Sequence, residues 1–269
     1  MSDIFDGLDK FGFDEIGGDL FEPDEEKKEK KNSPVKDVVD TSSYVYKKQF
    51  TCPVCSAEFV AILARTGKMR LNHVEYDLRP VYDYFEPLFY DVIICDKCGY
   101  AALSQQFYKI MDSQAELIQK QISNKFKSSG QTSEFTAETA EQRFKMAVLC
   151  AKIKKAPAGE IAYLCLKLGW IFKISGDAEN ERLFKEQAYR GFTIALAKET
   201  PPIMGLEEGT VLYVLAALAK DLRRNEEASR LLSEVIVSKK CTEALKTKAK
   251  DLKREILDEN VATQTADRL

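Results

Sequence analysis

The chain has 269 residues, of which 40 are Lys or Arg and 43 are Asp or Glu, so its formal net charge is -3. This length is sufficient to bury a hydrophobic core without disulfide support, and the charge balance excludes a general attraction to nucleic acid. The first residues, MSDIFDGLDK, do not resemble a secretory signal, and the longest apolar run, at 211–219, is shorter than the roughly 20 residues of a membrane span. We therefore expect a cytoplasmic protein with no membrane span.

Residues 1–40 form an acidic segment that ends in the charged run PDEEKKEKKNSP. Such a composition favours a disordered tail, because the segment cannot bury enough apolar surface to offset its ordering entropy. Large apolar residues nevertheless recur among the acids, and the candidates for contact with a partner are Phe5, Leu8, Phe11, Phe13, Leu20 and Phe21. The alternatives are a solvated tail with incidental aromatics and a segment that docks in a partner protein's groove.

Residues 44–103 are predicted to form a small β-rich module. Short runs rich in β-branched and aromatic residues, such as SYVYKKQFTC, EFVAIL and LFYDVIIC, alternate here with turn-like breaks. The stretch between the second and third runs, RTGKMRLNHVEYDLRPVYDYFEPL, has the character of an insertion. This module is therefore predicted to be a compact β unit with one long internal loop.

Two Cys-x-x-Cys pairs lie in this module, although the whole chain has only seven cysteines and one histidine. Cys52 and Cys55 with Cys95 and Cys98 supply four thiolates, the set with which Zn²⁺ makes a closed, tetrahedral structural site. The spacer of residues 56–94 exceeds the roughly 15 to 20 residues of common zinc ribbons, but loop closure costs rise only slowly with length. A dithiol redox site, an iron–sulfur cluster and a catalytic zinc remain as alternatives.

The spacer also contains Arg70, Asp77 and Arg79, a candidate polar cluster. These residues could bind an anion, or an internal Arg–Asp pair could fasten the long insertion to the rest of the protein.

From residue 104 to 258 the apolar residues follow a helical period. An Ala-x3-Phe-x2-Ala pattern begins at Ala140 and again at Ala188, and a weaker copy begins at Ala228. Together with Leu168-Gly169-x2-Phe172 this resembles the tetratricopeptide repeat. We expect helical hairpins at 104–155, 159–199 and 208–238, a capping helix near 242–258 and a disordered end at 259–269; an ordinary helical bundle is the alternative.

The remaining cysteines, Cys150, Cys165 and Cys241, lie in these helical stretches, the first two among apolar neighbours. A buried free thiol behaves as a small hydrophobic side chain. We therefore assign these three residues to packing rather than to chemistry.

The fold class expected from these patterns is α+β, mainly α: a small β-rich zinc module with four cysteine ligands, followed by an array of antiparallel helical hairpins. The CPVC motif, the run DLRPVYDYFEPLFYDVIICDKCGYAA and the helical GWIFKISGDAENE resemble the bacterial domain-of-unknown-function family 2225. The resemblance covers about residues 45–258, and it implies a zinc-binding front module and a tetratricopeptide-like back, but no reaction.

No phosphate-binding loop, dinucleotide fingerprint or His-Glu-x-x-His motif occurs in the sequence. We therefore expect a non-enzymatic protein-interaction or scaffold protein with a structural Zn²⁺, whose partners are proteins. The alternative is a nucleic-acid-associated zinc-ribbon factor, for which the lysine-rich last helix offers the most basic surface.

Overall fold

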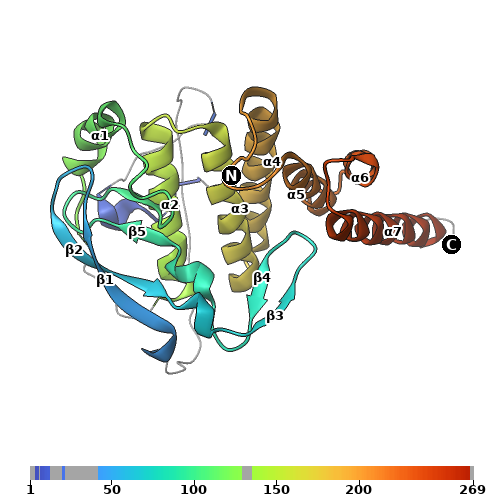
Figure 1. Ribbon diagram of the computed structural model, residues 1–269, viewed down its shortest axis with the longest axis horizontal. Coiled ribbons are helices and arrows are strands. Elements are labelled where there is room, and N and C mark those ends of the chain that lie inside the picture. The colour runs from blue at the N-terminus through green and yellow to red at the C-terminus, as the bar shows by residue number, and fades with distance from the viewer. Residues whose placement is uncertain (1–3, 6, 13–19, 22–41, 129–134, 267–269) are drawn as a thin grey trace.

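The computed structural model describes residues 4–5, 7–12, 20–21, 42–128 and 135–266. All of the strands in these ranges precede residue 104 and the long helices follow it, so the expected α+β, mainly α fold class is confirmed. Helices α2 (Ala137–Ile153), α3 (Ala158–Ser175) and α4 (Ala178–Lys198) lie side by side, with most of the strands beside α2 and the last three helices extending beyond α4 (Figure 1). None of the described helices is both long and apolar enough to cross a membrane.

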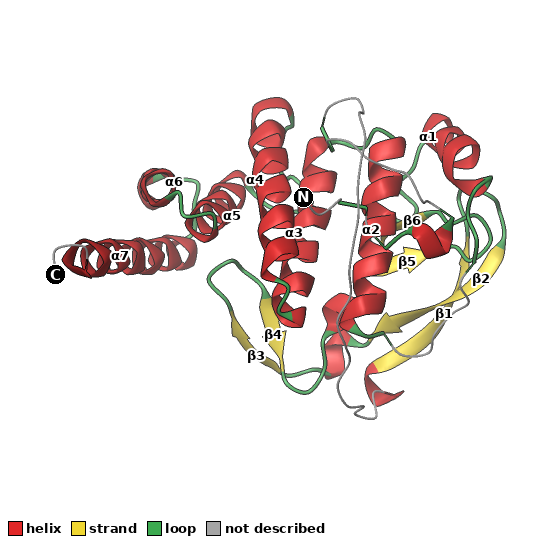
Figure 2. Ribbon diagram, turned by 180° about the vertical axis from the view of Figure 1, so that it is seen from behind, coloured by secondary structure: helices red, strands yellow, loops and turns green. Residues whose placement is uncertain are grey.

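Three antiparallel hairpins form the front module. Their strands are β1 (Val45–Thr51), β2 (Glu58–Ala64), β3 (Leu71–Val74), β4 (Pro80–Tyr82), β5 (Val92–Ile94) and β6 (Ala101–Leu103), and they pair as β1–β2, β3–β4 and β5–β6. The β3–β4 hairpin lies within the predicted insertion and stands apart from the other two (Figure 2). The insertion is therefore a structural element of its own.

An aromatic cluster fills the space beneath the β1–β2 hairpin. Phe50 and Phe59 face each other across the two strands with ring centroids 5.9 Å apart, and Phe107 meets both rings edge-on. The Tyr100 hydroxyl donates to the Phe107 carbonyl at 3.1 Å. Aromatic pairs at these spacings contribute about 0.5–1.5 kcal/mol each beyond their buried area, so this cluster stabilises the module.

The helical part contains two clear antiparallel hairpins, α3–α4 and α5–α6, and a final helix. Besides α2, α3 and α4, its helices are α1 (Asp112–Ile118), α5 (Glu208–Asp221), α6 (Asn225–Val237) and α7 (Glu243–Ala266). Gly176, with φ of +76°, ends α3, and the Asp177 side chain accepts from the Asn180 N–H to cap α4. These caps fix the tight turn of the α3–α4 hairpin, which agrees with the predicted 159–199 unit.

The small-large-small pattern faces the core in all three copies. Ala188, Phe192 and Ala195 are fully buried, and so are the corresponding positions that begin at Ala140 and Ala228. Gly169 lies close to α4, because a Cβ atom there would come within 3.1 Å of Lys185. The resemblance to the tetratricopeptide repeat therefore holds for the packing of these residues, but not for every expected hairpin.

The expected hairpin at 104–155 does not form. The helix α1 is short and continues into a π-helical turn at Gln119–Ser123, whereas α2 packs against α3 and against strands β5 and β6. The apolar face of α2 is thus shared between α3 and the strands, and the short α1 makes little contact with it. The end of the chain also differs from the expectation, because α7 continues to Ala266 where disorder was predicted from residue 259.

The described residues of the N-terminal segment pack on the body of the protein, so the expectation of disorder is wrong for them. We call these residues, 4–5, 7–12 and 20–21, the arm. Ile4, Phe5, Leu8, Phe11 and Leu20 are buried in the main hydrophobic core, and Phe21 is packed against it. Phe13 lies outside the described residues. The apolar residues that suggested a docking segment therefore find their contact surface in the same chain.

Candidate metal centre

The four cysteines of the two Cys-x-x-Cys pairs meet in space. Cys52 and Cys55 lie in the turn between β1 and β2, and Cys95 and Cys98 lie in the turn between β5 and β6. Their four sulfur atoms all lie within 4.8 Å of one another, although up to 46 residues separate the cysteines in sequence. The long insertion is accommodated outside this cluster, as the β3–β4 hairpin.

The two cysteine turns have the same backbone hydrogen bonds. In the first, the Cys52 N–H donates to the Ala57 carbonyl and the Ser56 N–H donates to the Cys52 carbonyl, each at 2.9 Å. In the second, the Cys95 N–H donates to Tyr100 and the Gly99 N–H donates to Cys95, also at 2.9 Å. Ser56 and Gly99 hold the equivalent left-handed position, with φ of +59° and +75°. Serine bears strain at this position that glycine does not, yet the first turn keeps the same hydrogen bonds as the second.

The sulfur positions fit one tetrahedral ion. Cys52 Sγ lies 3.5 Å from Cys98 Sγ, and Cys55 Sγ lies 3.7 Å from Cys95 Sγ. A tetrahedral site with metal–sulfur bonds of about 2.3 Å has sulfur–sulfur edges of about 3.8 Å. A disulfide would instead require about 2.05 Å. The geometry is therefore that of a metal site, and four thiolates would fill every position of a tetrahedral ion.

Contacts among the sulfurs favour the thiolate form at one cysteine. Hydrogen bonds from Cys52 and Cys98 lower the pKa of Cys95 to about 2, because they stabilise its negative charge. Hydrogen bonds to Cys52 and Cys95 raise the pKa of Cys98, and burial acts in the same direction. A metal cation at the centre would replace these thiol protons and would stabilise the thiolates by its positive charge.

A fifth cysteine supports the second turn without belonging to the cluster. The Cys150 thiol, fully buried on α2, accepts from the Ala101 N–H at 3.3 Å and donates to the Gly99 carbonyl at 3.7 Å. Burial raises the pKa of this thiol to about 12, so it stays protonated and donates. Its assignment to packing is consistent with this position, and its hydrogen bonds add a local link between α2 and the metal turn.

We expect Cys150→Ala to lower stability without changing metal content. The substitution removes a hydrogen-bond acceptor from the buried Ala101 N–H and leaves a small cavity, together about 1–3 kcal/mol. Urea unfolding would measure the loss, and elemental analysis would measure the metal bound per chain. A fall in metal content to half or less would show that Cys150 takes part in the metal site.

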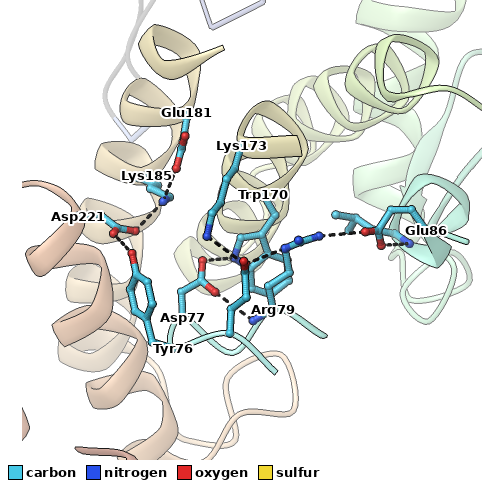
Figure 3. Close-up of polar contacts among 11 residues, drawn as sticks. Tyr76, Asp77, Arg79, Glu86, Trp170, Lys173, Glu181, Lys185 and Asp221 are labelled. Atoms are coloured by element: carbon cyan, nitrogen blue, oxygen red, sulfur yellow. Dashed lines mark hydrogen bonds and ion pairs between the residues drawn. The ribbon is translucent and has the colours of Figure 1, made fainter. Parts of the chain in front are cut away.

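Asp77 fastens the β3–β4 hairpin to α3, whereas the Arg79 side chain pairs with two glutamates and not with Asp77 (Figure 3). Asp77 is fully buried, and its carboxylate accepts from Trp170 Nε1 at 2.9 Å and from the Arg79 backbone N–H at 3.1 Å. The Arg79 guanidinium pairs with Glu75 at 2.8 Å and with Glu86 at 2.9 Å. Desolvation raises the pKa of Asp77.

The proposed three-residue cluster is thus not formed. Arg70 lies apart on the surface, with its side chain 89% exposed and Asp83 as its nearest acid at 3.9 Å. The interpretation that the cluster fastens the insertion fits Asp77, whose partner on α3 is Trp170 in place of an arginine. Arg79 pairs with Glu75 and Glu86, both within the insertion. In these contacts neither residue has the open geometry of an anion site.

The same contact contains residues that sequence reasoning missed. The Tyr76 hydroxyl donates to Asp221, and Lys185 pairs with Asp221 at 2.6 Å and with Glu181 at 2.5 Å. Lys173 pairs with Glu75 at 3.0 Å. The residues on the helix side of this contact come from α3, α4 and α5, so no local sequence motif identifies them. The sequence shows only that charged residues occur on otherwise apolar helix faces.

A pocket of about 560 Å³ opens between the loop before α1, the α2–α3 turn and the 199–204 loop. None of the four clustered cysteines lines it, and neither do Ser, Thr or His. Three of its charged residues already have partners: Lys154 and Glu160 pair with each other at 2.7 Å, and Glu199 accepts from the Gly159 N–H at 2.9 Å. The pocket is therefore separate from the metal centre and contributes no nucleophile of these types.

The fold and the centre together define a protein with a four-cysteine metal site whose two cysteine hairpins are joined to a helical array. The model of the family described as "Uncharacterized protein conserved in bacteria (DUF2225)" matches residues 45–256, and the chain belongs to this family. A curated relative, an uncharacterized protein of Borreliella burgdorferi, is 32% identical over 85 residues. The matched segment spans 29% of this chain and 30% of that relative. No solved structure is significantly similar to the chain.

Proposed function

We propose that the protein is a non-enzymatic cytoplasmic scaffold in which a structural Zn²⁺ holds the front module together and the helical array contacts partner proteins. Zinc is the preferred metal because it accepts four thiolates in a tetrahedron without a directional preference. The observation that carries the proposal is the closed sulfur set. Four sulfurs at tetrahedral spacing leave no position for a substrate or a water.

The surroundings of the centre favour a structural role over a catalytic one. The turns pack directly on the helices: Gln119 Nε2 donates to the Val54 carbonyl in the first turn, and Cys150 of α2 contacts the second. A metal embedded in such contacts sets the relative placement of two parts of the chain. A front module held rigidly against the helices in this way is suited to binding a partner protein.

The basic residues near the C-terminus do not favour the nucleic-acid alternative. Lys240 pairs with Glu208 at 2.7 Å, and Lys246 pairs with Glu243 at 2.8 Å. Part of the positive charge is thus compensated within the protein. Protein partners are the better-supported class.

Affinity capture from bacterial cells tests the proposal. The tagged full chain and a version without residues 1–40 would be captured with and without nuclease treatment, after crosslinking in the cell. We expect a partner set that resists nuclease and depends on the integrity of the metal centre, as tested with a Cys95→Ser chain. A set that disappears with nuclease, or turnover of a substrate by the purified protein, would contradict the scaffold proposal.

A further inference from the structure

The arm covers an apolar surface of its own protein. Leu8 is fully buried, and Ile4, Phe5 and Phe11 are each less than a tenth exposed. Burying a large apolar side chain contributes about 1.5–3 kcal/mol relative to leaving it exposed. The surface beneath these residues is apolar in turn, since they belong to one core cluster with the helices. If the arm left, a continuous apolar patch would be exposed, and such patches mark binding sites.

The arm's first anchor is specific in shape as well as apolar. Phe11 stacks on Phe126 with ring centroids 5.9 Å apart and an interplanar angle of 10°, and its carbonyl accepts from the Lys127 N–H at 2.9 Å. Gly12 follows with φ of +90°, and a Cβ atom there would lie 2.3 Å from the Lys125 carbonyl oxygen. The surface therefore recognises both an aromatic side chain and the backbone that follows it.

A second anchor lies between α3 and α4. The Phe21 ring sits against Gly191, where a Cβ atom would come within 2.6 Å of it and within 2.8 Å of the Ala162 methyl. The small residues Gly191 and Ala162 thus make room for an aromatic ring. An apolar ligand with two separated aromatic anchors fits this surface.

The charge around the anchors favours an acidic ligand. Lys152 lies 5.8 Å from the centroid of the Phe5 ring, and Arg190 lies 5.8 Å from that of Phe21. In the sequence, Asp3 and Asp6 flank the apolar pair Ile4 and Phe5. A cationic rim around aromatic pockets suits a segment in which acids alternate with large apolar side chains.

We propose that the surface beneath the arm is a peptide-binding groove, which the arm occupies in the same chain and which a partner segment of the same acidic and aromatic chemistry enters when the arm leaves. This inference rests on the proposed scaffold function and specifies its docking site. Because the arm is covalently attached, its effective concentration is on the order of millimolar. A partner must therefore overcome this internal competitor.

The test uses the full-length chain and a fluorescent synthetic peptide of residues 1–24. Leu8→Asp places a charge at a buried contact and should expel the arm, and Gly12→Ala should do so through its clash with Lys125, without changing any apolar side chain. Fluorescence anisotropy would measure peptide binding. We expect both variants to bind the peptide on the order of 10- to 100-fold more tightly than the wild-type chain, whose groove is occupied.

Two controls separate this result from others. Asp9→Asn changes an exposed residue of the arm and should behave as wild type, and a peptide carrying Leu8→Asp should not bind. Equal binding to wild type and variants, or no binding to either variant while circular dichroism shows both folded, would overturn the proposal. A wild-type dimer that becomes monomeric on Leu8→Asp would also overturn it, because the arm would then belong to a second copy.

The assay uses purified components alone, so it does not depend on finding a cellular partner. Failure to capture partners from cells would count against the scaffold function and leave the groove intact. Conversely, failure of peptide binding would remove the groove while captured partners could still contact another surface.

Discussion

Cys95→Ser is expected to abolish metal binding and to unfold the front module. The serine hydroxyl is a poor ligand for a soft metal site, and three sulfurs would remain with a thiolate charge that no partner compensates. Structural zinc supplies about 10–16 kcal/mol of binding free energy in small zinc domains, which is comparable to the whole stability of a protein domain. We expect metal content near zero by elemental analysis.

The loss should extend beyond the cysteine turns. Gly99 of the second turn packs on Phe126, since a Cβ atom at Gly99 would lie 2.5 Å from that ring, and Phe126 stacks on Phe11 of the arm. Loosening the turn therefore removes the support beneath the arm's anchor. Hydrogen exchange should report faster exchange in 45–64 and 92–103 and also in 8–12, whereas α5 and α6 keep their protection.

Cys165→Ala is the matched control, because it removes another fully buried thiol that lies outside the cluster. It should retain full metal content and native exchange in the front module. If the wild-type chain stays fully folded after exhaustive chelation, the metal is not a structural support and the prediction for Cys95 is wrong.

The metal centre could be predicted from sequence because its ligands form two local motifs. Each Cys-x-x-Cys pair fixes its own turn, and a single ion then requires the two turns to meet, whatever lies between them. The helices from α3 onward were equally accessible, since their period and their Pro and Gly boundaries are local features. The Leu168-Gly169-x2-Phe172 motif and the Ala-x3-Phe-x2-Ala pattern that begins at Ala188 together indicated the α3–α4 hairpin.

The misinterpreted parts depend on contacts between distant segments. The α2 pattern correctly indicated a helix with a small-residue face, but nothing local states that this face meets strands β5 and β6 as well as α3. The arm has the composition of a disordered segment, and its burial depends on pockets at Phe126 and Gly191, which are more than 100 residues away. The composition of a segment gives its own apolar and charged residues, but whether the segment is ordered also depends on the surface against which it packs.

Substitution of Asp77 should have the second large effect, because its carboxylate is the buried acceptor between the β3–β4 hairpin and α3. Asp77→Ala removes the partner of the Trp170 Nε1–H and of the Arg79 N–H, and the two unpaired donors should cost about 2–5 kcal/mol. Asp77→Asn keeps one carbonyl acceptor and should lose less. Trp170 is the only tryptophan of the chain, so its fluorescence during urea unfolding reports on this contact directly.

The pH dependence separates the buried charge from the hydrogen bonds. Desolvation raises the pKa of Asp77 above its value in the unfolded chain, so the native state binds a proton more readily than the unfolded state. The contribution of Asp77 to stability is therefore greatest below the unfolded pKa of about 3.9 and is lost as pH rises through the folded pKa. Asp77→Asn, which cannot ionise, should lack this loss, and the stability difference between wild type and Asp77→Asn should shift in favour of the variant as pH rises from about 4. A difference that shifts the other way would mean that the charged carboxylate is the form that the folded protein stabilises, with Lys173 and Lys185 outweighing the burial.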